Sequence, residues 1–372
     1  MMKIAFFTPT LKVGGYERVV MTYANALAQM EGNEVTLLCG ESAGELKDQV
    51  ADCVKIVDLH CRTRALLFRL VSYFRQEQPD CFYVGFRIYN SIAVLAKLFA
   101  GNRKTKIFIS QHGFEYQSKL QKWMHRIMQK RAAGFVAVTD SIKDFEQNSL
   151  HLSCPACVIG NPVVSPEMTV TRVKDAWFDD GRPVICVCGR LSEDKNMGLA
   201  VDVLQQLRSM SVPAKLLILG EGPEKAALVK KVESCGLERD VRFVGFVHNP
   251  MEYMKACTVY LHTCDREGFG NTVVEAMFSG LPVVTTDCGG PVDIIEKDKY
   301  GICFGNGREP SAAERGAQAV SRILTGECVF EGLREKALTY TVEASSQKLM
   351  CFFVGGEKDD SKKSPRNRVV AD

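Results

Sequence analysis

The chain has 372 residues, of which 46% are apolar and 24% are charged, a composition typical of a soluble globular protein with about two domains. Its net charge of +3 is too small for the basic surface of a nucleic-acid-binding protein, so we expect no nucleic-acid partner. No apolar run approaches the ~20 residues that span a bilayer. The first residues lead directly into a strand pattern without a signal-peptide cleavage segment, so we expect an unsecreted, cytoplasmic protein.

The first half of the chain alternates short strands with helices. Apolar runs predict strands at residues 3–7, 34–39, 54–57, 81–84, 106–110, 135–138 and 157–159. Segments of helical period lie between several of them, at residues 16–30, 65–76 and 91–100. This rhythm predicts a parallel sheet with helices on both faces.

The rhythm breaks at residues 161–181, which contain two prolines and end in Asp179-Asp180-Gly181, so we expect the linker there. Beyond it, strands are predicted at residues 184–188, 215–219, 241–244, 259–262 and 282–285, and helices at residues 197–210, 224–235 and 271–279. The chain is therefore expected to be an α/β protein with two doubly wound, Rossmann-like domains in tandem. Because ligands bind beyond the carboxyl ends of such strands, we expect a site in a central cleft between the domains.

The 15 cysteines are scattered and mostly lie in apolar runs, as buried thiols of an unsecreted protein do. The single C-x-x-C, at residues 154–157, supplies only half of a four-cysteine zinc site. A turn that leads into the next strand is the simpler interpretation.

The strongest motif is EGFGNTVVE at residues 267–275, in which two carboxylates lie eight residues apart around a glycine turn that opens a helix. The glycines permit close approach of a ligand, and free N–H groups at a helix N-terminus favour a phosphate. Glu267 can accept hydrogen bonds from sugar hydroxyls, and Glu275, about one turn into the helix, can reach a ribose diol. The candidate ligand-binding residues of this motif are Glu267, Phe269, Gly270, Asn271, Thr272 and Glu275.

A second motif, at residues 189–196, follows the predicted strand at 184–188 directly. Gly189 opens this loop, and Arg190 and Lys195 can together neutralise a diphosphate. A third motif, Gly14-Gly15 after the first strand, lets the backbone approach a phosphate or a sugar. It lacks the third glycine of the dinucleotide fingerprint, which argues against a nicotinamide oxidoreductase.

These motifs resemble those of family 4 of the retaining glycosyltransferases, which have the GT-B architecture. The resemblance covers residues 3 to about 350 and is most specific at residues 189–196 and 267–275. Weaker matches lie at the Gly14-Gly15 pair and at residues 161–163, 220–223, 244–246 and 289–291. Two positions depart from the family pattern: Asp293, where glutamate is common, and Cys303, where an aliphatic residue is usual.

The resemblance implies a role for each part of the chain. Arg190 and Lys195 would grip the donor diphosphate, Glu267 would hold the donor sugar, and Glu275 would bind the ribose. His112, directly after a strand, occupies the place of a family histidine near the anomeric carbon. Residues 1–165 would bind the acceptor, residues 166–340 would bind the nucleotide-sugar donor, and a helix at residues 341–354 would return to the first domain. Residues 355–372 are polar, and we expect them to be disordered.

The resemblance implies a transferase that moves a hexose or N-acetylhexosamine from a nucleotide diphosphate sugar, and UDP is the nucleotide we expect first. The acceptor would be a glycan or a polyprenyl-diphosphate-linked glycan of cell-surface polysaccharide biosynthesis. The configuration at the anomeric carbon would be retained. No residue stands out as a covalent nucleophile, and the sequence has no D-x-D that could hold a divalent metal. The cationic loop and the helix N-terminus can stabilise the leaving diphosphate instead, so we expect neither a metal nor a cofactor. An epimerase of the same architecture and a non-catalytic sugar-nucleotide binder remain alternatives.

Two basic, apolar segments in the first half, residues 62–75 and 119–131, predict contact with the inner face of an anionic membrane. Residues 1–165 carry 20 Lys and Arg against 14 Asp and Glu, a net +6, whereas the rest carries 27 against 30, a net −3. The competing interpretation is that each helix packs its apolar side on the sheet and exposes its charges to water.

Overall fold

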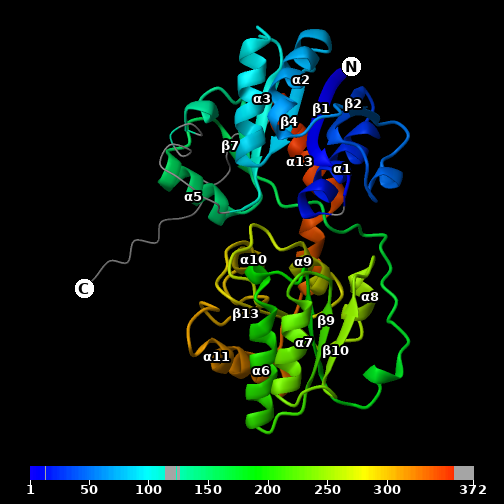
Figure 1. Cartoon of the computed structure of the whole chain (residues 1–372), viewed down its shortest axis with the longest axis vertical. Helices are drawn as coiled ribbons and strands as arrows, with labels where there is room; N and C mark the ends of the chain where they lie inside the picture. The colour runs from blue at the N-terminus through cyan, green and yellow to red at the C-terminus, as the bar shows by residue number, and fades with distance from the viewer. Residues whose placement is uncertain (13, 114–122, 124–125, 356–372) are drawn as a thin grey trace, which may run out of the picture.

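The structure is a computed structural model that describes residues 1–12, 14–113, 123 and 126–355. It consists of two α/β domains stacked along the long axis of the molecule, with the last helix lying beside the first one (Figure 1). The expected fold class, two doubly wound parallel sheets, is confirmed. Apart from Gly355, the polar tail lies outside the described residues, and so do residues 119–122, 124 and 125 of the second basic segment.

The N-terminal domain contains a seven-stranded parallel sheet in the order β3-β2-β1-β4-β5-β6-β7. Its strands are β1 (Met2–Thr10), β2 (Asn33–Glu41), β3 (Lys55–Asp58), β4 (Cys81–Gly85), β5 (Lys106–Gln111), β6 (Gly134–Ala137) and β7 (Ala156–Val158). Its helices are α1 (Gly15–Ala28), α2 (Thr63–Gln76), α3 (Arg87–Phe99) and α5 (Asp140–Leu150). The strand order reverses between β1 and β4, so the loops that follow these strands open beside each other at the ligand-binding edge.

The C-terminal domain contains a six-stranded parallel sheet in the order β10-β9-β8-β11-β12-β13. Its strands are β8 (Val184–Cys188), β9 (Lys215–Leu219), β10 (Val241–Gly245), β11 (Val259–His262), β12 (Val283–Thr285) and β13 (Gly301–Cys303). Its helices are α6 (Met197–Ser209), α7 (Lys225–Ser234), α8 (Pro250–Met254), α9 (Asn271–Phe278), α10 (Gly290–Ile294), α11 (Ala312–Leu324) and α12 (Leu333–Ala337). Here the reversal lies between β8 and β11, whose following loops carry the two strongest motifs.

Several elements differ from the predicted ones. The helix predicted at residues 91–100 begins earlier, at Arg87. The sequence analysis did not identify α5, α8, α10 and β13, four elements that are short or largely polar. Elements of three to five residues carry too few residues to show a period of their own, and their conformation depends on the neighbours they pack against.

The two chain crossings between the domains lie side by side. Residues 159–183 connect β7 to β8 with a single 3-10 turn, Ala176–Phe178. The Val163 N–H donates to the Tyr340 carbonyl at 3.0 Å, and the Val342 N–H donates to the Val164 carbonyl at 3.0 Å. Both connections between the domains therefore pass through one point.

The last helix, α13 (Val342–Val354), packs on α1 and belongs to the core of the first domain. Thr341 caps its N-terminus by accepting a hydrogen bond from the Ala344 N–H at 3.1 Å, and Gly355 ends it with a left-handed φ of 84°. Phe353 is 1% exposed and lies against the rings of Phe6 and Phe108, with centroid distances of 6.4 and 4.6 Å.

We predict that Phe353→Ala lowers the free energy of unfolding by about 3–5 kcal/mol, because truncation of a buried ring loses its burial and leaves a cavity. The adjacent Val354 is 59% exposed, so Val354→Ala is a matched control that should change the free energy by less than about 0.5 kcal/mol. Urea unfolding followed by circular dichroism measures both variants. Equal midpoints would show that α13 is not part of the folded core.

Candidate functional site

A cavity of about 700 Å³ lies between the two domains, at the edge where the strands of both sheets end. Loops after β1 and β5 line it from the N-terminal domain, and loops after β8, β9, β10 and β11 line it from the C-terminal domain. Every candidate residue from the sequence lies on its wall: Gly14, Gly15, His112, Gly189, Arg190, Lys195, Glu267, Phe269, Gly270, Asn271, Thr272 and Glu275. Their individual roles remain predictions.

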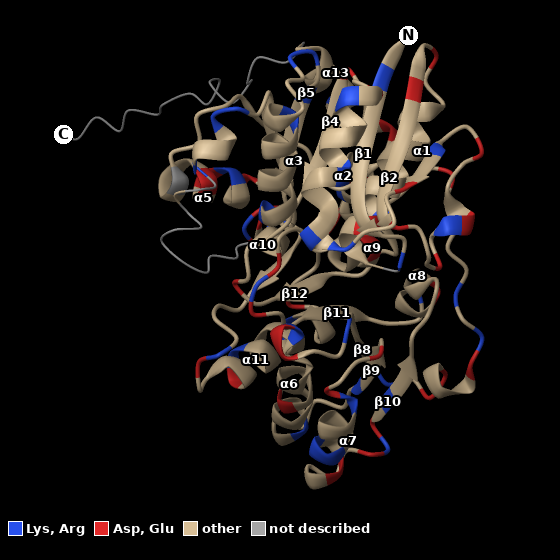
Figure 2. Ribbon diagram, turned by 45° about the horizontal axis from the view of Figure 1, so that its top comes forward, with Lys and Arg blue, Asp and Glu red and all other residues tan. Residues whose placement is uncertain are grey.

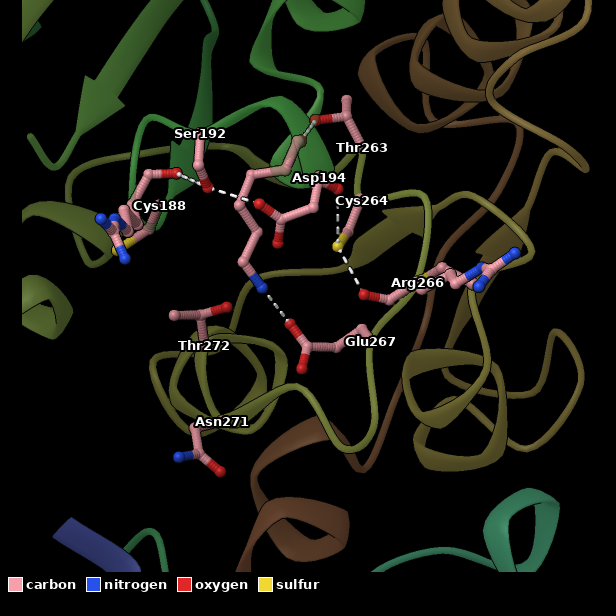
Figure 3. Close-up of polar contacts among 12 residues, drawn as sticks. Cys188, Ser192, Asp194, Thr263, Cys264, Arg266, Glu267, Asn271 and Thr272 are labelled. Atoms are coloured by element: carbon pink, nitrogen blue, oxygen red, sulfur yellow. Dashed lines mark hydrogen bonds and ion pairs between the residues drawn. The ribbon is translucent and has the colours of Figure 1, made fainter. Parts of the chain in front are cut away.

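Lys195 and Glu267, which both line the cavity, form an ion pair. Figure 3 marks it with a dashed line that ends on the labelled Glu267. The Lys195 Nζ lies 2.5 Å from Glu267 Oε2, and the two side chains are 23% and 21% exposed. Burial alone would lower the pKa of Lys195, but the nearby Glu267 carboxylate, together with Cys264 and Asp194, more than offsets burial and raises that pKa. Burial likewise works to raise the pKa of Glu267, and the Lys195 ammonium reverses the effect and lowers it. Both groups are therefore charged at neutral pH.

The backbone that carries this pair is fixed by contacts between two loops. Thr263 Oγ1 donates to the Lys195 carbonyl at 2.9 Å, and the Cys264 thiol donates to the Asp194 carbonyl at 3.1 Å (Figure 3). The Asp265 N–H donates to the same Asp194 carbonyl at 2.9 Å. The loop after β8 and the loop after β11 are thus joined before any ligand enters, which preorganises both charges.

The N-terminus of α9 points its backbone donors at the cavity. Gly270 adopts a left-handed φ of 101°, which glycine reaches without strain, and this turn starts the helix at Asn271. No side chain caps this helix N-terminus, so its first N–H groups are free to bind an anion. Tyr260 donates to Thr272 Oγ1 at 2.7 Å and fixes that residue in the first turn.

Glu275 is a buried carboxylate on the wall of the cavity, 8% exposed. Burial raises its pKa to about 7, and Arg18, which reaches the cavity from α1 of the other domain, opposes that rise. None of the ion pairs among the described residues includes Glu275, so its negative charge has no direct counter-ion within the protein. A carboxylate in this state is ready to accept hydrogen bonds from a ligand.

The N-terminal wall is built around Gly14-Gly15 at the start of α1. A Cβ at Gly15 would lie 3.9 Å from Asn271 Nδ2, so the glycine loop faces the N-terminus of α9 across the cavity. Asn161 Nδ2 donates to Asn271 Oδ1 at 2.8 Å and connects the start of the linker to the same residue. Asn271, at the start of α9, therefore lies close to both the start of α1 and the start of the linker.

His112 follows β5 at the N-terminal wall. Its Nε2 lies 3.1 Å from Ser110 Oγ, and its ring packs edge-on against Tyr16 with a centroid distance of 5.0 Å. Burial lowers its pKa to about 4, so the imidazole is neutral at neutral pH. A Cβ on Gly268 would overlap the His112 carbonyl, 2.0 Å away, so only glycine lets the two domains come this close.

Asp293, the first departure from the family pattern, makes a contact between the domains. Its carboxylate accepts hydrogen bonds from the Ser141 N–H at 2.9 Å and from Ser141 Oγ at 2.8 Å, at the N-terminus of α5. Cys303, the second departure, lies in β13 and does not line the cavity. The first departure therefore contributes to domain contact and the second is remote from the site.

Within the described part of the chain, one group of side chains has the composition of a metal site. His262, Cys264 and Glu267 each offer a ligand atom within 4.8 Å of the others. One observation disfavours a cation there: the Lys195 ammonium already neutralises Glu267. Metal independence nevertheless stays a prediction.

Other residues of the cavity wall were not identified as site residues from the sequence. They include Tyr16, Arg18, Glu45, Asn161, Glu221, Phe246, His248 and His262. Arg18 lies four residues after Gly14 on α1, so the glycine motif could have indicated it. His262 ends an otherwise apolar strand, and a polar residue at the carboxyl end of a strand was the available signal for it.

Comparisons with known proteins identify the family of the chain. A family model described as "Glycosyltransferase Family 4" matches residues 13–164, and one described as "Glycosyl transferases group 1" matches residues 172–341. The amylovoran biosynthesis glycosyltransferase AmsD of Erwinia amylovora is 28% identical over 300 residues, which cover 78% of this chain and 82% of AmsD.

A second relative is the N-acetylgalactosamine-N,N'-diacetylbacillosaminyl-diphospho-undecaprenol 4-alpha-N-acetylgalactosaminyltransferase of Campylobacter jejuni. It is 25% identical over 357 residues, which cover 91% of this chain and 94% of the relative. Among solved structures, Anabaena HepE in complex with UDP superposes with a TM-score of 0.75 at 19% identity, covering 95% of this chain and all of HepE. The chain therefore belongs to family 4 of the glycosyltransferases and has their GT-B fold.

Proposed function

We propose that the cavity binds a nucleotide diphosphate sugar, with UDP as its nucleotide, and transfers a hexose or N-acetylhexosamine to a glycan or lipid-linked acceptor in bacterial cell-surface polysaccharide biosynthesis. The observation that carries this proposal is the Lys195–Glu267 pair beside the uncapped N-terminus of α9. HepE, which shares the fold, was solved with UDP, and the Campylobacter relative is named for an undecaprenol-linked acceptor.

When the donor binds, its diphosphate and its sugar would take the places that Lys195 and Glu267 fill for each other in the ion pair. Lys195 and Arg190 would neutralise the diphosphate together with the free N–H groups of α9, and Glu267 would accept hydrogen bonds from the hydroxyls of the sugar. Glu275 would accept the ribose hydroxyls. The acceptor would enter from the N-terminal domain, on the side of His112. Each cation of the site would thus contact a phosphate of the donor, and each carboxylate would contact hydroxyl groups.

We propose that transfer proceeds with retention and without a metal. In support, two cations and a helix N-terminus line the same cavity, where they would stabilise the negative charge that develops on the leaving diphosphate. The leaving phosphate would itself accept the proton of the acceptor hydroxyl, so no covalent protein nucleophile is required. Assays of transfer in excess EDTA test metal independence. If EDTA stops transfer and added Mg²⁺ or Mn²⁺ restores it, the reaction requires a metal and this proposal is wrong.

We predict that Lys195→Ala and Glu267→Ala each lower the rate of transfer by ~10²–10³, because each removes one preorganised charge contact. Their effects on UDP should differ: Lys195→Ala weakens stabilisation by UDP, whereas Glu267→Ala retains it. Lys231→Ala, which breaks a surface pair with Asp202, is the matched control and should keep near wild-type turnover.

The measurement is acceptor-dependent release of UDP, followed by thermal unfolding with and without UDP. Release that requires the acceptor also separates a transferase from an epimerase and from a non-catalytic binder. A Glu267→Ala enzyme with wild-type turnover would overturn the site assignment.

We predict that Glu275→Gln stabilises the empty protein and weakens binding of UDP. The folded-state pKa of about 7 exceeds the ordinary 4.5, so ionised Glu275 destabilises the fold. This cost is absent below pH 4.5, grows between pH 4.5 and 7, and is complete above pH 7, where it amounts to about 3 kcal/mol. The glutamine variant should therefore melt higher than wild type at pH 8 but not at pH 4.5.

Differential scanning fluorimetry at the two pH values, with and without UDP, measures both effects. Glu233→Gln, a change at an exposed position on α7, controls for the loss of one surface charge. Identical melting temperatures and identical UDP responses at pH 8 would show that Glu275 is neither strained nor in contact with the nucleotide.

We further propose that α2 and α3 place the N-terminal domain on the inner face of an anionic membrane. Neither helix contains an Asp or Glu (Figure 2), and α2 carries Arg64, Arg69 and Arg75. Leu66, Leu70, Tyr73 and Phe74 of α2 are buried, as the competing interpretation expects. However, Phe68 is 74% exposed and Phe99 is 60% exposed. No helix of the described chain has the length and hydropathy needed to cross a bilayer.

We predict that the protein sediments with vesicles of anionic lipid at low salt, and that Phe68→Ser with Arg69→Ser weakens this binding several-fold. Loss of one inserted ring and one cation removes both the apolar and the electrostatic contribution. The matched control is Val329→Ser with Lys230→Ser in the C-terminal domain, where Val329 is 77% exposed. Equal binding by both double variants, or none by wild type, would contradict the proposal.

A further inference from the structure

His262 is a buried histidine on the cavity wall with a polar atom that nothing in the structure satisfies. Its side chain ends β11 and is 5% exposed, and its Nε2 has no hydrogen-bond partner. Buried polar atoms almost always have a partner, because one left without a hydrogen bond costs folding free energy. Because His262 also lines the cavity, we look to a bound ligand for the missing partner.

The ring is held at a defined place beside the candidate catalytic pair. The His262 carbonyl accepts a hydrogen bond from the Thr286 N–H at 3.0 Å, which ties its backbone to the end of β12. The next residue, Thr263, donates to the Lys195 carbonyl at 2.9 Å. One ring nitrogen lies within 4.8 Å of a Glu267 carboxylate oxygen. The imidazole thus occupies the part of the cavity wall next to Glu267.

The charge state of His262 suits recognition of a neutral polar group. Burial lowers the pKa of His262 to about 4, and the nearby Glu267 and Lys195 act on that pKa in opposite directions. The ring is therefore neutral at neutral pH and offers one N–H donor and one acceptor nitrogen. Sugar hydroxyls and acetamido groups are neutral and offer the complementary atoms, whereas a phosphate would favour a cation.

A purely structural role explains this histidine poorly. The other residues of β11 are Val259, Tyr260 and Leu261, all buried, and an aliphatic side chain at position 262 would fill the same strand end without an unsatisfied nitrogen. A role as a metal ligand conflicts with the Lys195 ammonium that already neutralises Glu267. Recognition of the donor sugar meets neither objection.

We propose that His262 is a specificity-determining residue, whose ring hydrogen-bonds a hydroxyl or acetamido group of the donor sugar next to the hydroxyls held by Glu267. This inference rests on the proposed function, since it assumes that the cavity binds a sugar nucleotide. It adds a residue that distinguishes one donor sugar from another. Arg190, Lys195 and Glu275 would instead bind the diphosphate and the ribose, which are common to all donors with the same nucleotide.

The test compares wild type, His262→Leu and His262→Gln. Wild type is first assayed with UDP-glucose, UDP-galactose, UDP-N-acetylglucosamine, UDP-N-acetylgalactosamine and GDP-mannose, and the preferred donor is then supplied as analogues that each lack one hydrogen-bonding substituent of the sugar. With the intact donor, we expect kcat/KM of His262→Leu to fall ~10–100-fold. With the analogue that lacks the contacted group, wild type and His262→Leu should be nearly equal, as a double-mutant cycle requires.

Two further readouts separate recognition from folding. The affinity for UDP, which lacks the transferred sugar, should stay within about twofold of wild type in His262→Leu. The melting temperature of this variant should be unchanged or higher, because leucine leaves no unpaired nitrogen. His262→Gln, which keeps a donor and an acceptor, should recover part of the discrimination.

The outcomes are distinct. Equal loss by His262→Leu with the intact donor and with every analogue, or no loss with any donor, overturns the inference while leaving the proposed function standing. Failure of wild type to bind UDP or any of the five donors contradicts the proposed function itself, and the inference falls with it.

Discussion

The ion pair between Lys195 and Glu267 is the interaction around which the site is arranged. Each partner lies on a loop that follows a central strand of the second sheet, and contacts between the two loops fix both backbones. Two opposite charges at 2.5 Å satisfy each other in the empty protein, so a partly buried cation and anion can be kept ready without an unpaired charge. A ligand that carries both negative phosphates and neutral hydroxyls is the kind of molecule that can replace this mutual pairing.

Glu275 differs from Lys195 and Glu267 because no opposite charge pairs with it directly. Its carboxylate is buried without a direct counter-ion, and its pKa rises to about 7 for that reason. His262 adds an unsatisfied buried nitrogen to the same wall. Polar groups that destabilise the empty fold concentrate at ligand sites, since a stable core would replace them with apolar residues. The cavity thus combines one satisfied pair with groups that remain unsatisfied until a ligand binds.

The site also depends on the way the two domains are joined. Both chain crossings pass through the contact between Val164 and Val342, and α13 returns to bury Phe353 in the first domain. Asp293 and Ser141 connect the domains on one side of the cavity, and Asn161 and Asn271 connect them at the glycine loop. Because the two walls of the cavity come from different domains, these contacts hold the walls together.

The sequence alone determined the fold class and most of the site, because strand–helix periodicity and glycine-bounded loops are local properties. The spacing of Glu267 and Glu275 around a helix start, of Arg190 and Lys195 within one loop, and the Gly14-Gly15 pair indicated eleven of the residues that line the cavity. The twelfth, His112, came from the family resemblance. Elements of three to five residues, such as α10 and β13, could not be predicted because their conformation depends on their neighbours.

Only the tertiary structure showed that Lys195 is paired with Glu267, 72 residues away, because charge pairing across loops depends on how the strands are ordered in the sheet. It alone placed Arg18 of α1 opposite Glu275 of α9, and it alone showed that the Nε2 of His262 has no partner. Burial and hydrogen-bond satisfaction are properties of packed surroundings, which no local sequence pattern encodes.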